Sequence, residues 1–226
     1  KGNLNINALE NALKTLIGRH ESLRASFSND NVYMTIFKDF PIKISHKDIS
    51  DQTEKEKDTS KDVLIKNDAN YLFDLINGPL VKISLITINA LDNLLVLTVH
   101  HSICDGLSVD VLLKELSILY SAYVEDKEHK LSEPHAYSVF AEKENKFLES
   151  SNYKTSEFWV NMYKNSVPKI ELPLDYPRPK TRTYNNDVLF FKLSNVLFEK
   201  LKQLGINNGC SIVTTFMSAF ELFLYQ

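Results

Sequence analysis

The sequence predicts an α/β (α+β) protein, because strand-like apolar runs and amphipathic helical segments are interleaved along the chain. Residues 79–89 and 94–101 are two apolar runs separated by a short polar stretch, which is typical of a β-hairpin. Residues 5–19 and 109–123 instead repeat apolar side chains at helical spacing. The chain has 226 residues, of which 43% are hydrophobic and 24% charged, so it can bury a sizeable core and has an ordinary globular composition.

The first helix, over 5–19, is predicted from one continuous apolar face. That face consists of Ile6, Leu9, Leu13, Leu16 and Ile17. Residues 23–28 and 32–38 have strand-like patterns on either side of a turn-rich linker. A third, half-exposed strand is predicted where Ile42, Ile44 and His46 alternate with polar residues.

The charged run over 51–62 predicts a solvated loop that leads into a helix. After it comes the hairpin, with its turn at residues 90–93. Its second strand is almost continuously apolar over 94–99, which predicts a strand buried on both faces. The helix over 109–123 follows, with Ser108 as its expected N-cap.

In the second half, helices are predicted over 136–149, 154–164, 195–204 and 211–225, and a strand over 188–193. The aromatic side chains of the first two helices have a spacing that favours a core rather than a ligand site. They are Tyr137, Phe140, Phe147, Phe158, Trp159 and Tyr163. Residues 168–182 contain four prolines and are the clearest linker. The last helix has an apolar stripe for which the sequence offers no partner.

Composition argues against several classes of function. A net charge of −3 gives no reason to expect nucleic acid as a partner. No apolar run is long enough to span a bilayer, so no membrane association is expected. Two cysteines do not make a disulfide framework, which favours a reducing cytoplasm. Cys104 could be a nucleophile if the following helix lowered its pKa, but a packing role is the expectation.

The best candidate site is the sequence HHSICDG, residues 100–106, between the apolar strand and the helix. Adjacent strand residues point to opposite faces, so His100 and His101 are not expected to share a site, which argues against a two-histidine metal site. His101 shares its side with Leu95, Leu97 and Val99, but alternation alone does not tell which side is a cleft.

Asp105 and Gly106 complete this stretch. A carboxylate just beyond a buried strand needs a partner, either an arginine or backbone N–H groups. Gly106 allows backbone conformations and close approach that a side chain would block, and it lies just ahead of a helix N-terminus, which favours developing negative charge. A histidine beside such donors can support acyl transfer. The alternative is a pair of structural histidines.

HHSICDG resembles the His-His-x-x-x-Asp-Gly motif of the condensation domains of nonribosomal peptide synthetases and of the wider chloramphenicol-acetyltransferase-like superfamily. Three further stretches resemble the same family in the same order. They are RHESLRASF at 19–27, FDL with GPL at 73–80, and LPLDYPRP at 172–179. The resemblance implies a chloramphenicol-acetyltransferase-like lobe with a mixed sheet packed against helices, at 1–167. It also implies an inter-lobe linker at 168–186 and the start of a truncated second lobe at 187–226.

The resemblance also implies a reaction. An upstream carrier-bound acyl or peptidyl thioester would be joined to the amine of a downstream aminoacyl thioester, each held on the phosphopantetheine arm of a carrier protein beside an adenylation domain. His101 would accept or position the amine proton, and N–H groups near Gly106 would stabilise the oxyanion. His100 and Asp105 would shape the loop, and Arg19 or Arg24 would pair with Asp105. No metal and no directly bound cofactor are expected.

Three alternatives remain open from the residues alone. A CoA-dependent acyltransferase and an epimerization domain of the same superfamily share the histidine motif. A non-catalytic module that only docks carrier proteins is the third, although the intact His101, Asp105 and Gly106 argue against it. Whether residues 1–226 are active alone, and which residues they would join, cannot be predicted from the sequence.

Overall fold

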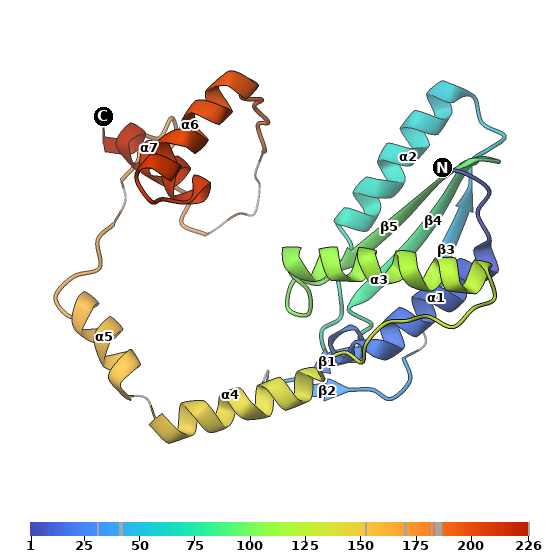
Figure 1. The fold of residues 1–226 in the computed structure, drawn as a ribbon, viewed down its shortest axis with the longest axis horizontal. Helices are drawn as coiled ribbons and strands as arrows, with labels where there is room; N and C mark the ends of the chain where they lie inside the picture. The colour runs from blue at the N-terminus through green and yellow to red at the C-terminus, as the bar shows by residue number, and fades with distance from the viewer. Residues whose placement is uncertain are drawn as a thin grey trace. The chain divides into compact units, whose positions relative to one another are not determined.

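The computed structural model describes residues 1–30, 32–40, 43–151, 153–169, 171–181, 183 and 187–225. They divide into two compact units, Lys1–Ser166 and Val167–Gln226. The elements of the first unit, shown in Figure 1, are α1 (Ile6–Arg19), the 3-10 helix η1 (Glu21–Arg24), β1 (Ala25–Phe27), β2 (Met34–Ile36), β3 (Ile44–Asp48), α2 (Glu54–Ala69), β4 (Val81–Asn89), β5 (Asp92–Val99), α3 (Gly106–Val124), α4 (Tyr137–Ser151) and α5 (Tyr153–Tyr163). The second unit contains α6 (Asn195–Asn207) and α7 (Ile212–Tyr225).

A three-stranded sheet in the order β3-β4-β5 is the framework of the first unit. β4 runs parallel to β3 and antiparallel to β5, so the sheet is mixed. The predicted hairpin is confirmed, and its register pairs Val81 with Val99 and Leu85 with Leu95. β1 and β2 form a separate antiparallel pair, as the two strand-like segments predicted. The predicted α/β class, with a mixed sheet packed against helices, is therefore correct.

Helices cover both faces of this sheet. Val81, Ile83 and Leu85 of β4 belong to the main apolar core together with buried side chains of α1 and α3. The intervening Lys82 forms an ion pair with Asp68 of α2, with Nζ 2.6 Å from Oδ1. Because successive strand residues point to opposite faces, α1 and α3 pack on one face and α2 on the other. Figure 1 shows α1 and α3 side by side.

Two expectations about the sheet and the first helix are wrong. β5 is half-buried along its whole length rather than buried on both faces, because it is an edge strand that pairs only with β4 among the described residues. The most buried strand is β4, in which residues 81 and 83–86 are buried and which has a neighbour on each side. Ile6 is exposed, whereas the other predicted apolar residues of α1 are buried. Of the predicted third strand, Ile42 lies outside the described residues.

Two helices begin earlier than predicted, in each case at a capping box that the prediction did not use. α2 begins at Glu54, so most of the charged run is helical rather than loop. Thr53 and Glu56 form a capping box there, which satisfies free N–H groups of the first turn. α3 begins at Gly106, and its N-cap is Asp105 rather than Ser108.

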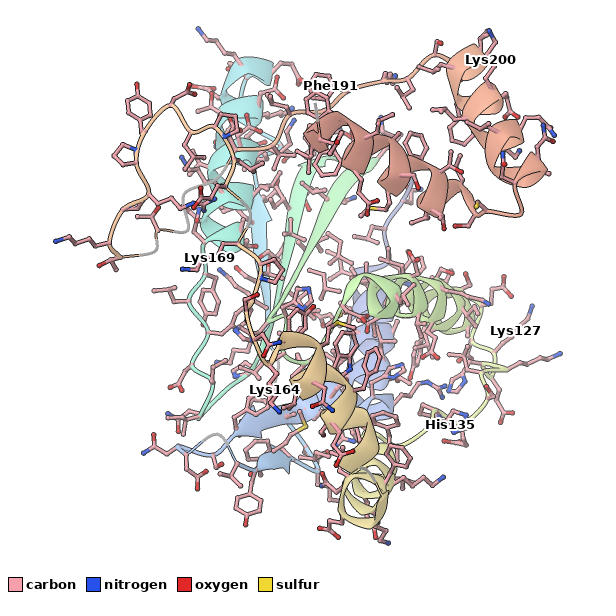
Figure 2. The ribbon with its side chains drawn as sticks, turned by 90° about the vertical axis from the view of Figure 1, so that its left-hand side faces the viewer. Lys127, His135, Lys164, Lys169, Phe191 and Lys200 are labelled. Carbon is pink, nitrogen blue, oxygen red and sulfur yellow. The ribbon has the colours of Figure 1, made fainter. Side chains whose placement is uncertain are left out.

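The second half of the chain has its predicted helices but not its predicted packing. The six aromatic residues expected in a core on α4 and α5 are all at least 42% exposed rather than buried. Residues 187–193 form no strand, since no described segment pairs with them. Figure 2 labels Phe191 in that segment, and it is 84% exposed. No helix among the described residues is long and apolar enough to cross a membrane.

Candidate active site at the end of β5

The histidine pair lies in the turn that leaves β5. The backbone N–H of His100 donates to the carbonyl of Leu80 at 2.9 Å, which continues the β4–β5 pairing by one residue. The N–H of Ile103 then donates to the carbonyl of His100 at 3.1 Å and closes a turn. Ile103 is buried in the core, so the loop is anchored on both sides of the exposed His101. The pair is therefore held on a rigid support.

His100 has a structural environment. Its Nδ1 accepts a hydrogen bond from the N–H of Ser102 at 3.2 Å and lies 2.7 Å from the Ser102 hydroxyl. Its ring meets Phe73 edge to face, with ring centroids 6.0 Å apart. Since the bond from the Ser102 N–H occupies Nδ1 as an acceptor, the neutral ring carries its proton on Nε2. These contacts agree with the predicted role of His100 in shaping the loop.

His101 has the opposite environment. Leu95, Leu97 and Val99 of β5 pack against the core formed with α1 and α3, and His101 follows in the turn beyond the end of the strand. Its imidazole is exposed and has no hydrogen-bond partner among the described residues. The two histidines therefore differ in their surroundings, and His101 is the one that lines a cavity.

A cavity of about 260 Å³ opens beside His101. Its lining consists of Ser22, Met34, His101, Ser102, Ile103, Cys104, Asp105, Ser108 and Tyr137. Three larger cavities contain no histidine: two of about 550 and 360 Å³ lie against α1, and one of about 520 Å³ lies at the start of α2. We assign the site to the smaller cavity because it combines an unpaired imidazole with a helix start, which the larger ones lack. Among the described residues, no cluster of three or more potential metal ligands occurs.

Asp105 caps α3 rather than pairing with an arginine. Its Oδ1 accepts hydrogen bonds from the Ser108 N–H at 2.8 Å and the Ser108 hydroxyl at 2.6 Å. These bonds, first the hydroxyl and then the N–H, hold the pKa of Asp105 below its usual range, and nearby His101 lowers it further by a smaller amount. The carboxylate therefore stays ionised and fixes the start of α3 beside His101.

Gly106 is the first residue of α3. Its φ is not among the positive values, which occur at Gly2, Gly78 and Gly209, so no unusual backbone conformation requires glycine here. A Cβ added at Gly106 would meet nothing within 4 Å. The first N–H groups of a helix have no acceptor in a preceding turn, and because Asp105 already accepts from the Ser108 N–H, those of Gly106 and Leu107 are the ones that can serve a ligand. The predicted oxyanion role of Gly106 stays a prediction.

The predicted pairing of Arg19 or Arg24 with Asp105 is wrong. The Nε of Arg19 donates to Oε2 of Glu115 at 3.2 Å, and its Nη2 donates to the carbonyl of Ser132 at 2.6 Å. Arg24 donates to main-chain carbonyls of residues 17, 37 and 38. Both arginines have structural roles, but they fasten other segments because Asp105 is already satisfied by Ser108.

Glu115 is a structural residue that the sequence pattern did not single out. His20 Nε2 lies 2.8 Å from the same Oε2 that receives Arg19, so one carboxylate joins the end of α1 to α3. Burial raises the pKa of Glu115, but the hydrogen bonds from Arg19 and His20 outweigh it and leave that pKa lowered. A signal was present, because Glu115 lies at helical spacing between the buried Leu112 and Leu119.

Cys104 does not have the environment of a nucleophile. Burial is the largest effect on its thiol, and it raises the pKa despite a hydrogen bond with Ser108. A raised pKa keeps the sulfur protonated, and a protonated thiol is a weak nucleophile. The expected packing role of Cys104 therefore fits the structure.

Comparison with known proteins identifies a family from the sequence. The family model described as "Condensation domain" matches residues 1–226. A linear gramicidin synthase of Brevibacillus parabrevis is 31% identical over 230 residues, covering 100% of this chain and 4% of that protein. Bacitracin synthase 3 of Bacillus licheniformis is 32% identical over 229 residues, covering 99% and 3%.

Solved structures agree with the fold. VibH, described as a condensation enzyme, superposes with a TM-score of 0.73 at 20% identity, covering 99% of this chain and 51% of VibH. The chain thus spans about half of that structure and a few per cent of the two synthases. The helix-covered mixed sheet, the histidine pair at its edge and the match over the whole length lead to one conclusion: this chain belongs to the condensation domain family.

Proposed function

We propose that this chain contributes the histidine-bearing half of a site for peptide-bond formation in nonribosomal peptide synthesis. The observation that carries the proposal is the exposed His101, which has an unpaired imidazole in a cavity beside the start of α3. Membership of the condensation domain family supports it. The reaction joins an upstream acyl or peptidyl thioester to the amine of a downstream aminoacyl thioester.

In the proposed step, the amine nitrogen attacks the thioester carbonyl and a C–N bond forms. His101 accepts a proton from the amine or orients the amine for attack. The carbonyl oxygen becomes negative in the tetrahedral intermediate, and the backbone N–H of Gly106 lies at the positive end of the α3 dipole. When the C–S bond breaks, the thiolate leaves and takes up a proton, so the products are an amide and a thiol.

The substrates define the partners. Both thioesters would be carried on phosphopantetheine arms of upstream and downstream carrier proteins, in a protein that also holds an adenylation domain. Because the thioester is already activated, the proposed step itself uses no metal and no bound cofactor. We place the protein in the cytoplasm, where the free thiols of Cys104 and Cys210 would remain reduced.

The test uses the full-length protein that contains this chain, with both carriers loaded and the amide product measured by mass spectrometry. His101→Ala should lower the rate at least about 100-fold, the usual contribution of a positioned general base. The matched control is His129→Ala. It removes an exposed histidine of the connector, residues 125–136 between α3 and α4, and should change the rate less than about twofold.

Three results would contradict the proposal. Wild-type rates in His101→Ala would exclude His101 from the chemistry. Inversion of an aminoacyl centre without amide formation would indicate an epimerization domain. Acyl transfer from free CoA, with none from a carrier, would indicate the CoA-dependent acyltransferase alternative.

A further inference from the structure

We propose that Tyr137 is a substrate-positioning residue of the His101 cavity and that the carboxylate of Glu21 holds it in place. This inference rests on the proposed function, because the substrate it concerns is the aminoacyl thioester that supplies the amine. The sequence predicted Tyr137 to be a core residue and gave no role to Glu21.

The walls of the cavity come from separate parts of the first unit. Ser22 belongs to η1, Met34 to β2, and Ser108 to α3, while residues 101–105 form the loop. All of these segments lie within or beside the packed core. Tyr137 differs, because it begins α4 and follows residues 125–136, which form neither helix nor strand. Its place in the wall therefore depends on a specific attachment.

Glu21 supplies that attachment. Its Oε2 accepts a hydrogen bond from the N–H of Ser138 at 2.7 Å, and its Oε1 accepts one from the Ser138 hydroxyl at 3.1 Å. The bond from this N–H is the largest effect on Glu21 and lowers the pKa of its carboxyl, so it is ionised at neutral pH. An anion is favoured at a helix N-terminus, and this one reaches α4 from a residue 117 positions earlier.

The residues around Glu21 strengthen the same attachment. Arg19, two positions earlier, holds the connector at the carbonyl of Ser132. Arg19 and His20 both bind Glu115 on α3, the helix whose N-terminus lies at the cavity. Residues 19–21 thus bind three segments, namely α3, the connector and α4, close to the His101 cavity. A substitution at Glu21 removes the hydrogen bonds to α4 and a weaker electrostatic interaction with Arg24, and it leaves the contacts of Arg19 and His20 in place.

The chemistry of Tyr137 fits contact with a substrate rather than with the core. Its side chain is 42% exposed, and its ring lies against Phe140 with centroids 6.2 Å apart. The rest of the wall is mainly hydroxyl, thiol and imidazole, so the ring is a broad apolar surface in a polar cavity. We therefore expect the ring to pack on the carbon skeleton of the aminoacyl group while His101 faces its amine.

The test measures amide formation by the full-length protein, with leucyl-pantetheine as the probe for the amine-side thioester. Tyr137→Ala should raise KM for this probe about tenfold and change kcat less than about twofold, because an apolar contact is lost from both the ground state and the transition state. Tyr137→Phe should keep KM within about twofold. Glu21→Ala should raise KM in the same direction as Tyr137→Ala. The matched control, Glu142→Ala, alters a carboxylate of α4 that pairs with Lys146 and should change nothing.

A double variant separates positioning from general damage to the fold. If Glu21 acts through Tyr137, adding Glu21→Ala to Tyr137→Ala should raise KM less than about twofold further. Additive effects, or a loss of kcat alone, would overturn the role of Glu21. An unchanged KM in Tyr137→Ala would overturn the role of Tyr137 while the proposed function stands. Failure of the wild-type protein to form any amide would contradict the proposed function and, with it, the aminoacyl thioester as the substrate that Tyr137 contacts.

Discussion

Residues 1–124 and the described residues from 137 onward both contain amphipathic helices, but they differ in how much of the apolar surface is buried. Among the described residues, every buried apolar side chain lies at or before Leu119. Beyond that point, Gly205 is the only described residue that is buried. α1 and α3 pack against the sheet and against each other, whereas α4, α5 and α7 have exposed large apolar side chains. Periodicity therefore predicts a helix reliably, but it does not identify the partner of that helix.

The largest difference in the free energy of unfolding should come from truncating one apolar side chain in each region. Leu119 of α3 is fully buried, so Leu119→Ala should lower the free energy of unfolding by about 2–5 kcal/mol, through lost burial and a cavity. Phe220 of α7 is 55% exposed, and Phe220→Ala should cost less than about 0.5 kcal/mol. Urea denaturation followed by circular dichroism measures both. Equal losses would show that α7 is covered in solution and that the two regions do not differ as described.

A smaller difference in the free energy of unfolding should come from replacing two glutamates, Glu115 and Glu142, by alanine. Glu115→Ala leaves Arg19, whose side chain is 9% exposed, without its carboxylate, and should cost about 2–3 kcal/mol. Glu142→Ala breaks an exposed pair with Lys146 one helical turn away and should cost about 0.3–0.5 kcal/mol. The same denaturation experiment compares them. A Glu115→Ala protein as stable as the wild type would contradict the anchoring role of this carboxylate.

The same pair predicts a dependence on pH. The pKa of Glu115 is lower in the folded chain than its ordinary value of 4.5, so its contribution is fully present above that value. It is lost as the pH falls from there through the lowered pKa. Unfolding midpoints measured between neutral and strongly acid pH should therefore fall less steeply in Glu115→Ala than in the wild type. The Glu142→Ala variant should follow the wild-type curve.

The smallest contrast concerns two helix caps. Asp105→Ala removes the acceptor of the Ser108 N–H in α3, and Ser194→Ala removes that of the Leu197 N–H in α6. Hydrogen exchange of each capped amide should become about tenfold faster without a matching change in the urea midpoint. Only Asp105→Ala should also slow amide formation, because only that cap lies beside His101. Protection of the Ser108 amide equal to wild type would show that Asp105 is not the cap.

Much of the fold was predictable because local signals agree with the tertiary structure. The hairpin and the apolar face of α1 follow from local sequence patterns, and the structure confirms them. The burial of β5 and the surroundings of the α4 and α5 aromatics depend on neighbours distant in sequence, and these predictions were wrong. The partner of Asp105 was missed for another reason. A capping box three residues away competed with the distant arginines and formed instead.

The register of β5 has a consequence for exchanging segments between relatives of this chain. From Val81–Val99 to Thr87–Asn93 the hairpin pairs without interruption, and the only shift lies between Thr87 and Asn89, next to the turn. A residue inserted near the turn can enlarge that bulge and leave the strand end unchanged. A residue inserted between Asn93 and Val99 would reverse the parity of everything after it, so that the position now held by His101 would face the environment of His100. Chimeric hairpins should therefore be joined at the turn, and the distance from Asn93 to the histidine pair should be conserved to the residue.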